Sequence, residues 1–194
     1  MNTLYIARHG QTTANVAGRF PGYREWPLTD LGKRQARGMG RILRRELGPR
    51  PSRAFVSSPL GRAQETMRLI RDELDLPAGD FATDVWLLDI NHGDWTGLTE
   101  DEVRERDPDA HRLRWADKWH VRMPGGECYG DLAVRVRAFL HDLAGDTVTV
   151  SHGATTQMLR GLCTGMDEKL IPDLDEPQAC VFRVRGTVIE RLDA

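Results

Sequence analysis

The chain has 194 residues and a formal net charge of −2, with 40% hydrophobic and 29% charged residues. These totals are ordinary for a globular protein and predict one domain spanning residues 1–194. The small net charge argues against a broad basic face for nucleic acid, and no apolar run approaches the roughly 20 residues that a membrane span needs. Since the N-terminus also lacks a signal-peptide pattern, we expect a cytoplasmic protein without nucleic-acid or membrane partners.

The three cysteines, Cys128, Cys163 and Cys180, are odd in number and far apart in the chain. None of them belongs to a CxxC pair, so the pattern indicates neither a disulfide framework nor a zinc site. We therefore expect free thiols.

The first half of the chain alternates short β-rich runs with amphipathic runs, as in a layered α/β fold. We expect, in order, a strand at 3–7, a helix at 29–47, a strand at 53–57 and a helix ending near residue 74. Gly48-Pro49 ends the first helix. Ser58 suits the N-cap and Pro59 the first position of the second helix.

The second half opens with a less regular region and then returns to the same alternation. We expect a short strand within 80–88, an elaborated cap or loop region at 89–127, a helix at 131–143, a strand at 146–150, a helix ending near 161, and a terminal hairpin at 179–184 and 188–192. The predicted fold class is therefore α/β, with three α/β/α layers around a mostly parallel central sheet.

Two predicted strands end in the same way, in a polar residue followed by His and Gly: Arg8-His9-Gly10 and Ser151-His152-Gly153. In an open α/β sheet, ligands bind where strands give way to helices. The turn after the strand at 53–57 sends Arg62 to the same edge. Guanidinium groups fit phosphate oxygens, and a histidine among them can attack phosphorus. The pattern thus predicts a phosphate site.

Each of these residues also has an ordinary explanation. A single His at a strand end often bonds only to backbone, and a single Arg near a helix start is usually solvated. A metal site is the main competitor for paired histidines, but no HxH, HExxH or carboxylate cluster accompanies them. Four such residues in matching contexts favour the phosphate site over packing or metal binding.

Six sequence blocks stand out along the chain: RHGQTTAN (8–15), GRFPGYREWPLTDLGKRQA (18–36), SSPLGRAQET (57–66), LLDINHGDWTGLT (87–99), PGGE (124–127) and VSHG (150–153). In these blocks and in their order, the sequence resembles the histidine phosphatase superfamily, in its phosphoglycerate-mutase-like branch. RHG alone is a weak signal, whereas six ordered blocks covering nearly the whole chain are a strong one.

The resemblance implies that His9 is the nucleophile that becomes phosphohistidine, and that Arg8, Asn15, Arg62 and His152 form the phosphate pocket. Such a pocket needs no metal or other cofactor, because its cationic donors stabilise the transferred phosphoryl group. His9 must attack through an unprotonated nitrogen, so we expect its other nitrogen to donate to a carbonyl. We expect His152 to be protonated and to donate to the phosphoryl group.

Gly10 and Gly153 are expected to bring the backbone close to the anion. The position of the general acid departs from the family pattern, which usually has a glutamate where this chain has Asp89. We assign that role to Asp89; the alternative is a mere hydrogen-bonding partner. An aspartate with the ordinary pKa of about 3.9 would be almost wholly ionised near neutral pH, so its pKa must be raised.

Further candidates lie in the loops around this edge. Gln11 and Thr12 are predicted substrate contacts or helix-start residues, and Arg19 and Tyr23 are predicted to approach the substrate from the first loop. Cap-region residues are predicted either to shape the leaving-group side or to pack the loop onto the core: Trp95, Trp115, Trp119, His120 and Arg122.

The leading functional hypothesis is a metal-independent phosphomonoesterase acting on a small phosphorylated metabolite. The alternative is a cofactor-dependent phosphoglycerate mutase; against it, Arg112 and Arg114 alternate where mutases resemble one another in having an adjacent arginine pair. A third hypothesis is an inactive protein that binds a phosphorylated ligand. The terminal hairpin or an exposed sheet edge could pair two copies into a homodimer.

Overall fold

The computed structural model describes residues 2–193 and contains a six-stranded sheet in the order β3-β2-β4-β1-β5-β6. The strands are β1 (Thr3–Arg8), β2 (Ala54–Ser57), β3 (Ala82–Thr83), β4 (Thr147–Ser151), β5 (Val181–Arg185) and β6 (Val188–Leu192). The first four run parallel to one another, whereas β5 pairs antiparallel with β1 and with β6. The predicted mostly parallel α/β sheet is confirmed.

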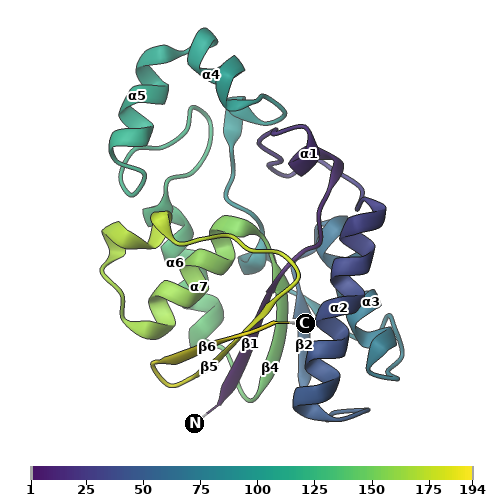
Figure 1. Ribbon diagram of the computed structural model, residues 1–194. Helices are drawn as coiled ribbons and strands as arrows, with labels where there is room; N and C mark the ends of the chain where they lie inside the picture. Colours follow the sequence, from purple (N-terminus) through teal and green to yellow (C-terminus); the bar gives the residue numbers. More distant parts are fainter. Residues whose placement is uncertain (1, 194) are drawn as a thin grey trace.

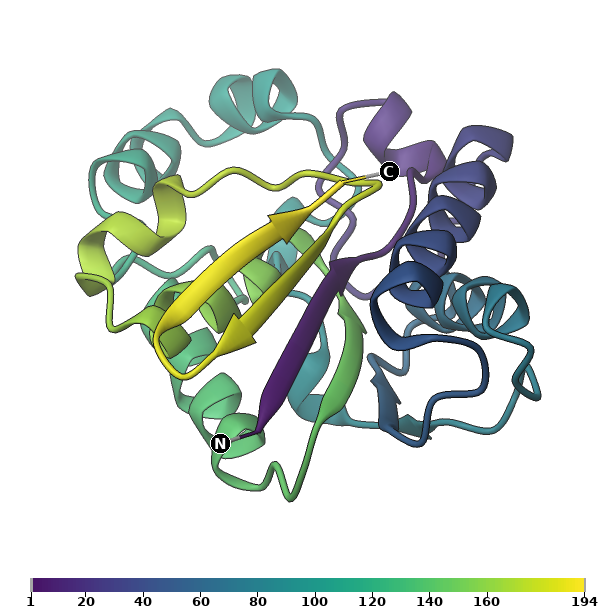
Figure 2. The same ribbon diagram turned by 60° about the horizontal axis from the view of Figure 1, so that its bottom comes forward.

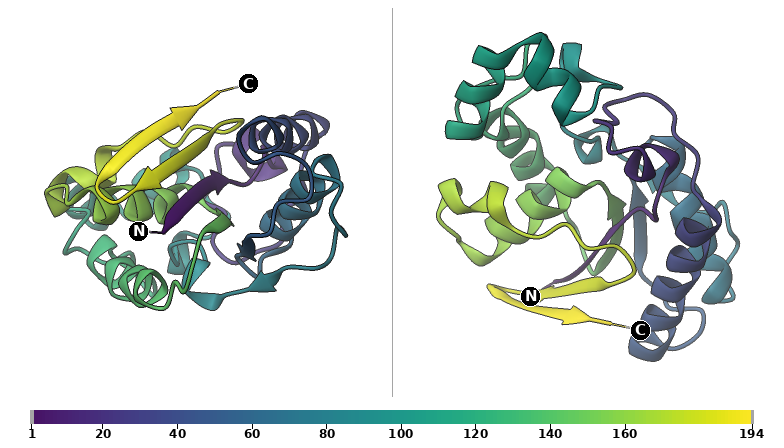
Figure 3. Two further views of the ribbon diagram at one scale, coloured as in Figure 1. Left: turned by 90° about the horizontal axis from the view of Figure 1, so that it is seen from below. Right: turned by 45° about the horizontal axis from the view of Figure 1, so that its top comes forward.

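Helices cover both faces of this sheet. The α-helices are α1 (Thr13–Val16), α2 (Asp30–Leu47), α3 (Gly61–Glu73), α4 (Glu100–Arg106), α5 (Pro108–Ala116), α6 (Tyr129–His141) and α7 (Gly153–Thr164); the short 3-10 helices are η1 (Val85–Leu87), η2 (Gly93–Trp95) and η3 (Glu168–Asp173). Figure 1 shows α2 and α3 on one side of the strands and α6 and α7 on the other. The end-on view in Figure 3 (left) shows the same three layers.

Strand β1 is buried on both faces, because its side chains alternate between the two helical layers. Leu4 and Ile6 belong to the core shared with α6 and α7, whereas Tyr5 and Ala7 belong to the core shared with α2 and α3. All four side chains are at most 5% exposed. This double burial fixes the register that delivers Arg8 and His9 to the end of the strand.

The predicted cap region, 89–127, contains η2, α4 and α5 and lies beyond the end of the sheet to which β1 and β4 point (Figure 1). Its two helices stand above the rest of the molecule in Figure 3 (right). An aspartate and a proline begin helix α5. The Asp107 side chain is the N-cap and accepts a hydrogen bond from Ala110 N, and Pro108 is the first residue of the helix. The short helical pieces expected from the sequence are confirmed.

The terminal hairpin of β5 and β6 lies along β1, as Figure 2 shows in yellow beside purple. It begins two residues later than predicted, at Val181. Within residues 2–193, no helix combines the length and the apolar content that crossing a bilayer requires. The three cysteines are free, as predicted.

Three helices have boundaries that differ from the predictions. Helix α3 begins at Gly61, so the predicted N-cap at Ser58 is wrong. The Ser58 hydroxyl instead bonds to the His152 ring, and the Gly61 amide donates to the carboxylate of Glu25. Helix α6 begins and ends two residues earlier than expected, and α7 continues to Thr164, where Gly165 in the left-handed conformation ends it.

Candidate active site

A cavity of about 300 Å³ lies at the edge where β1 and β4 end, between the sheet and the cap. Its lining includes these residues predicted from sequence: Arg8, His9, Asn15, Arg19, Asp89, Gly153, Trp95 and Trp115. Because Arg8 is in register with Ser151, the next residues of the two strands, His9 and His152, lie side by side. Their ring centres are 5.1 Å apart. The paired strand ends therefore form one site.

His9 is held in a single orientation and is 1% exposed. Its Nδ1 lies 2.8 Å from the carbonyl oxygen of Gly10, an acceptor that requires Nδ1 to carry the proton. Burial, together with the Arg8 and Arg62 charges, holds the pKa of His9 well below its ordinary value. The ring is thus neutral with an unprotonated Nε2, the form predicted for a nucleophile.

Arg62, at the start of α3, is 1% exposed and connects His152 and Asp89 by hydrogen bonds. Its Nε donates to His152 Nδ1 over 3.2 Å, and one terminal nitrogen donates to Asp89 over 3.2 Å. The carbonyls of Gly22 and Arg24 accept its remaining hydrogen bonds at 2.9 and 3.0 Å. Side-chain and backbone acceptors together therefore fix this buried guanidinium.

His152 is fully buried between two hydrogen bonds. Its Nδ1 accepts from Arg62, and its Nε2 lies 2.8 Å from the Ser58 hydroxyl. Burial and the nearby Arg62 charge hold the pKa of His152 well below its ordinary value. The expectation that His152 is protonated is therefore wrong for this state of the protein, because a proton on Nδ1 would face the Arg62 donor.

Asp89 lines the cavity and is 4% exposed. One carboxylate oxygen accepts from Arg62, and the same oxygen is 3.8 Å from His152 Nδ1; the other oxygen accepts from the Ile90 amide at 3.0 Å. Burial raises the pKa of Asp89, although the charges of Arg62, Arg8 and Arg135 oppose the shift. This is the direction that a proton donor at neutral pH requires.

The segment between η3 and β5 supplies two residues that sequence reasoning missed, Glu176 and Gln178. The Glu176 carboxylate lines the cavity 3.3 Å from an Arg8 nitrogen. Gln178 donates to the His9 carbonyl and to Asn15 Oδ1, both over 3.2 Å. The run DLDEPQ before the hairpin has no hydrophobic periodicity, so its acidic residues were the only feature of the sequence that could have indicated a site residue there.

Thr12 and Asn15 form a reciprocal cap at the start of α1. The Asn15 amide donates to the Thr12 hydroxyl, and Asn15 Oδ1 accepts from the Thr12 amide at 2.9 Å. Thr12 is therefore the helix-start residue of the two alternatives, and it does not line the cavity. Gln11 and Tyr23 are likewise outside the lining; Gln11 accepts from Thr29, and Tyr23 is 41% exposed.

The two glycines have different reasons to lack a side chain. A Cβ at Gly10 would lie 2.2 Å from the Gly32 carbonyl oxygen, so the close approach to α2 already requires a glycine there, and the contact of Gly10 with the anion stays a prediction. A Cβ at Gly153 would lie 1.9 Å from a carboxylate oxygen of Glu176. Gly153 therefore does permit the close approach of an anionic group, here a carboxylate.

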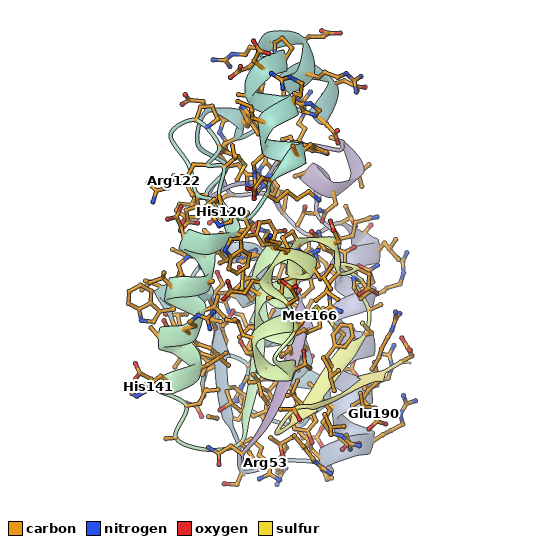
Figure 4. The ribbon with its side chains drawn as sticks, turned by 90° about the vertical axis from the view of Figure 1, so that its left-hand side faces the viewer. Arg53, His120, Arg122, His141, Met166 and Glu190 are labelled. Carbon is orange, nitrogen blue, oxygen red and sulfur yellow. The ribbon has the colours of Figure 1, made fainter. Side chains whose placement is uncertain are left out.

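The cap residues divide into two groups. Trp95 and Trp115 line the cavity, and Phe20 contacts both rings with centre distances of 6.2 and 6.3 Å. Trp119, His120 and Arg122 do not line it. Figure 4 shows His120 and Arg122 at the surface below helices α4 and α5 of the cap, and the side chains of both are 67% exposed. They therefore do not shape the leaving-group side.

Comparison with known proteins shows the family to which the chain belongs. A profile of the histidine phosphatase superfamily (branch 1) matches residues 4–188. The chain belongs to the histidine phosphatase superfamily. It is 36% identical over 178 residues to a 2,3-bisphosphoglycerate-dependent phosphoglycerate mutase of Methylobacterium radiotolerans, a match that covers 88% of this chain and 83% of the relative.

Solved structures of this superfamily have the same fold. An alpha-ribazole phosphatase from Shigella flexneri superposes with a TM-score of 0.84 at 25% identity, covering 99% of this chain and 96% of the other. A mycobacterial glucosyl-3-phosphoglycerate phosphatase superposes with a TM-score of 0.80 at 28% identity, covering 100% and 98%. Relatives of this histidine phosphatase domain thus include both hydrolases and mutases, which supports phosphoryl transfer as its chemistry.

Proposed function

We propose that the protein is a metal-independent phosphomonoesterase that hydrolyses a small phosphorylated metabolite through a phosphohistidine on His9. The observation that carries this proposal is the neutral His9 ring, whose Nδ1 is bonded to the Gly10 carbonyl while the ring faces a cavity that also contains Arg8 and Asp89. Such a ring presents an unprotonated Nε2 beside a fixed positive charge and a protonatable carboxyl group. The cavity volume is at the lower end for ligand sites, as suits a small metabolite.

In the first step, His9 Nε2 attacks phosphorus and the P–O bond to the leaving group breaks. Asp89 gives its proton to the departing oxygen, so the alcohol leaves neutral. Arg8 and Arg62 offset the charge on the phosphoryl oxygens as the transition state forms. The arriving dianion also favours protonation of His152, which can then donate to the same oxygens.

In the second step, a water molecule attacks phosphorus from the side that the alcohol has left. The Asp89 carboxylate takes a proton from this water, and the P–N bond breaks to regenerate His9 and release inorganic phosphate. Hydrolysis needs water to enter, and Glu176, with its side chain 38% exposed, marks an open side of the cavity.

A phosphoglycerate mutase is the second candidate, because the mutase of Methylobacterium radiotolerans is a relative at 36% identity. Of the alternating arginines, Arg114 lines the cavity, whereas Arg112 pairs with Asp109 and is 70% exposed. One arginine rather than a pair therefore faces the leaving-group side. This arrangement favours hydrolysis over the return of the phosphoryl group to a bound acid.

Phosphate release from a panel of phosphorylated metabolites tests the proposal, together with interconversion of phosphoglycerates measured with and without bisphosphoglycerate. We expect phosphate release, and acid-labile, base-stable labelling of the protein by substrate phosphorus. His9→Ala abolishes both, whereas His141→Ala, whose side chain is 88% exposed, changes neither. Mutase turnover that exceeds phosphate release would overturn the hydrolase assignment.

The role of Asp89 is tested by comparing two kinds of ester. Asp89→Asn lowers the hydrolysis of alkyl phosphates by about 10²–10⁴-fold, because the alkoxide then leaves without a proton. Nitrophenyl phosphate, with a better leaving group, loses far less. Since Asp89 must be protonated and burial raises its pKa, wild-type activity declines as the pH rises through that raised pKa. Equal losses for both esters would return Asp89 to a hydrogen-bonding role.

A further inference from the structure

The Glu176 carboxylate lies where an anion in the phosphate pocket would be held. One carboxylate oxygen is 3.3 Å from the Arg8 guanidinium. The same oxygen is so close to Gly153, the first residue of α7, that a Cβ there would clash with it. First-turn amides of a helix lack helical partners and attract negative charge, as does a guanidinium. Glu176 therefore occupies anion-binding positions of the proposed active site.

Charged and titratable groups face Glu176 from several elements. They are Arg8 of β1, Asp89 of the loop after η1, Arg160 of α7, Lys118 of the segment after α5, and the Tyr129 hydroxyl of α6. Arg160 is paired with Asp175 and Lys118 with Asp173. Among residues 2–193, Arg8 alone forms an ion pair with Glu176.

The environment of Glu176 destabilises the ionised form of its carboxyl group. Although its side chain is 38% exposed, partial burial raises the pKa of Glu176; the Asp89 charge raises it further, and the charges of Arg8, Arg160 and Lys118 lower it. A bound phosphoryl dianion would add negative charge to the same space and would compete for Arg8. The ionised carboxylate and the dianion therefore oppose each other, and protonation of Glu176 removes the conflict.

We propose that Glu176 binds the phosphoryl group in its protonated form, so that each binding event takes up a proton from the solvent. This inference rests on the proposed function and concerns the same pocket. The carboxylate gains a proton, and its O–H then donates to a phosphoryl oxygen while Arg8 turns its charge to the same group. Glu176 is thus a specificity-determining residue that makes affinity for phosphate and its esters pH-dependent.

A consequence concerns the release of product. Above the raised pKa, the ionised Glu176 competes with inorganic phosphate for Arg8, so the product is held weakly. Below the raised pKa the competition ends and the product is held more tightly. Each pH unit above that pKa weakens anion binding by up to about tenfold, because one proton must be supplied.

A purely structural role for Glu176 predicts the opposite result. If the carboxylate only holds Arg8 in place, Glu176→Gln removes the ion pair and leaves Arg8 only the Glu176 carbonyl as acceptor, and anion binding weakens at every pH. If Glu176 competes with the anion, Glu176→Gln removes the repulsion and keeps a hydrogen-bond donor. Anion binding then becomes tighter above the raised pKa of Glu176.

Sulfate is a suitable probe, because it remains a dianion between about pH 5 and pH 8, the range in which protein histidines and raised carboxyls titrate. Its binding is measured by calorimetry on the full chain across this range, in two buffers of different ionisation enthalpy at each pH to obtain proton uptake. The proteins are wild type, Glu176→Gln, Glu176→Ala, and Glu105→Gln as a matched control on the exposed face of α4.

For the wild type we expect sulfate affinity to fall as the pH rises, with proton uptake on binding. Above the raised pKa of Glu176, Glu176→Gln binds sulfate more tightly than the wild type, by up to about tenfold for each pH unit, and takes up as much as one proton fewer. Glu176→Ala gains less than Glu176→Gln, since it loses the donor as well as the charge. Glu105→Gln behaves as the wild type.

Weaker binding by Glu176→Gln, or unchanged affinity with unchanged proton uptake, overturns the inference. Failure of the proposed function gives a different result: the wild type then releases no phosphate from any ester, while the sulfate measurements still decide the role of Glu176. A wild type that binds no sulfate contradicts both, because the pocket itself is then not an anion site.

Discussion

The two ends of the cavity are built in different ways. At the phosphate end, His9 lines the cavity, and Arg62 and His152 lie outside the lining and contact the residues that form it. Each of the three is at most 1% exposed and is held by hydrogen bonds to backbone carbonyls or to another of the three. At the cap end, Trp115 is 39% exposed and its contacts are ring to ring, with His111 at 4.2 Å and Phe20 at 6.3 Å. One end is rigid and polar, and the other is partly open and aromatic.

This difference assigns different tasks to the two ends. Preorganised charges in a buried setting stabilise a transition state because they need not rearrange during the reaction. Aromatic walls on loop-connected helices bind by contact area and shape, and they tolerate changes in the bound group. Changes at the phosphate end should therefore lower kcat, whereas changes at the cap end should raise KM.

Of the three substitutions that test this division between the two ends, Arg62→Lys is expected to have the largest effect. Lysine keeps the positive charge but cannot reach His152, Asp89 and the Gly22 carbonyl together, because it lacks the planar fork. We expect kcat to fall by about 10²–10³-fold with the fold retained, as measured by steady-state kinetics and circular dichroism.

Arg68→Lys is the matched control, since Arg68 lies on the exposed side of the same helix and bonds only to Gln64 among the side chains described. It should leave kcat within about twofold of wild type. If Arg62→Lys instead changes only KM, the phosphate end is not preorganised in the sense proposed.

The sequence predicted the phosphate end well, and the reason is physical. His9 and His152 follow parallel strands, and strand ends that carry polar residues must converge at one edge of a sheet. Periodicity also located most strands and helices. The predicted position of the α3 N-cap was wrong because the Ser58 hydroxyl forms a tertiary hydrogen bond with His152, a contact that the local sequence pattern does not predict.

The sequence did not predict Glu176, Gln178 or the neutral state of His152. The first two lie in an irregular segment far along the chain from Arg8 and His9, so only the fold brings them together. The protonation state of His152 depends on the Arg62 donor at 3.2 Å, a distance that spacing in the chain does not encode. The geometry of the cap could not be predicted for the same reason.

A smaller effect is expected at the cap end, for Trp115→Ala. Loss of an aromatic wall removes contact area from the leaving-group side, so we expect KM for nitrophenyl phosphate to rise about tenfold while kcat changes by less than about twofold. Leu113→Ala, on the same helix, 50% exposed and outside the lining, should change neither constant. A fall in kcat equal to the rise in KM would erase the proposed division between the two ends.

The smallest effect concerns His92, which lines the cavity. It is 8% exposed, stacks on Phe20 at 5.2 Å, and its buried Nδ1 has no hydrogen-bond partner among the described residues. Burial lowers the pKa of His92 from 6.5 to about 3. The folded protein therefore keeps His92 neutral while the unfolded chain protonates it below about pH 6.5.

Because the unfolded state binds the extra proton, the folded state loses stability as the pH falls from about 6.5 towards 3, by up to about 1.4 kcal/mol per pH unit. His92→Phe removes this loss and keeps the stacked ring. We expect the two proteins to be nearly equal in stability at pH 7, and the variant to be more stable by about 2 kcal/mol at pH 5, or about 4–8 °C in Tm.

Thermal unfolding of both proteins from pH 7 to pH 5 measures this difference. His9 and His152 also have lowered pKa values, but they contribute equally to both proteins, so the growth of the difference with acidity isolates His92. His141→Phe is the control, because His141 lies at the far end from the cap (Figure 4) with an 88% exposed side chain and should show no such growth. A constant difference at all pH values would mean that His92 keeps its ordinary pKa in the fold and is protonated there below about pH 6.5.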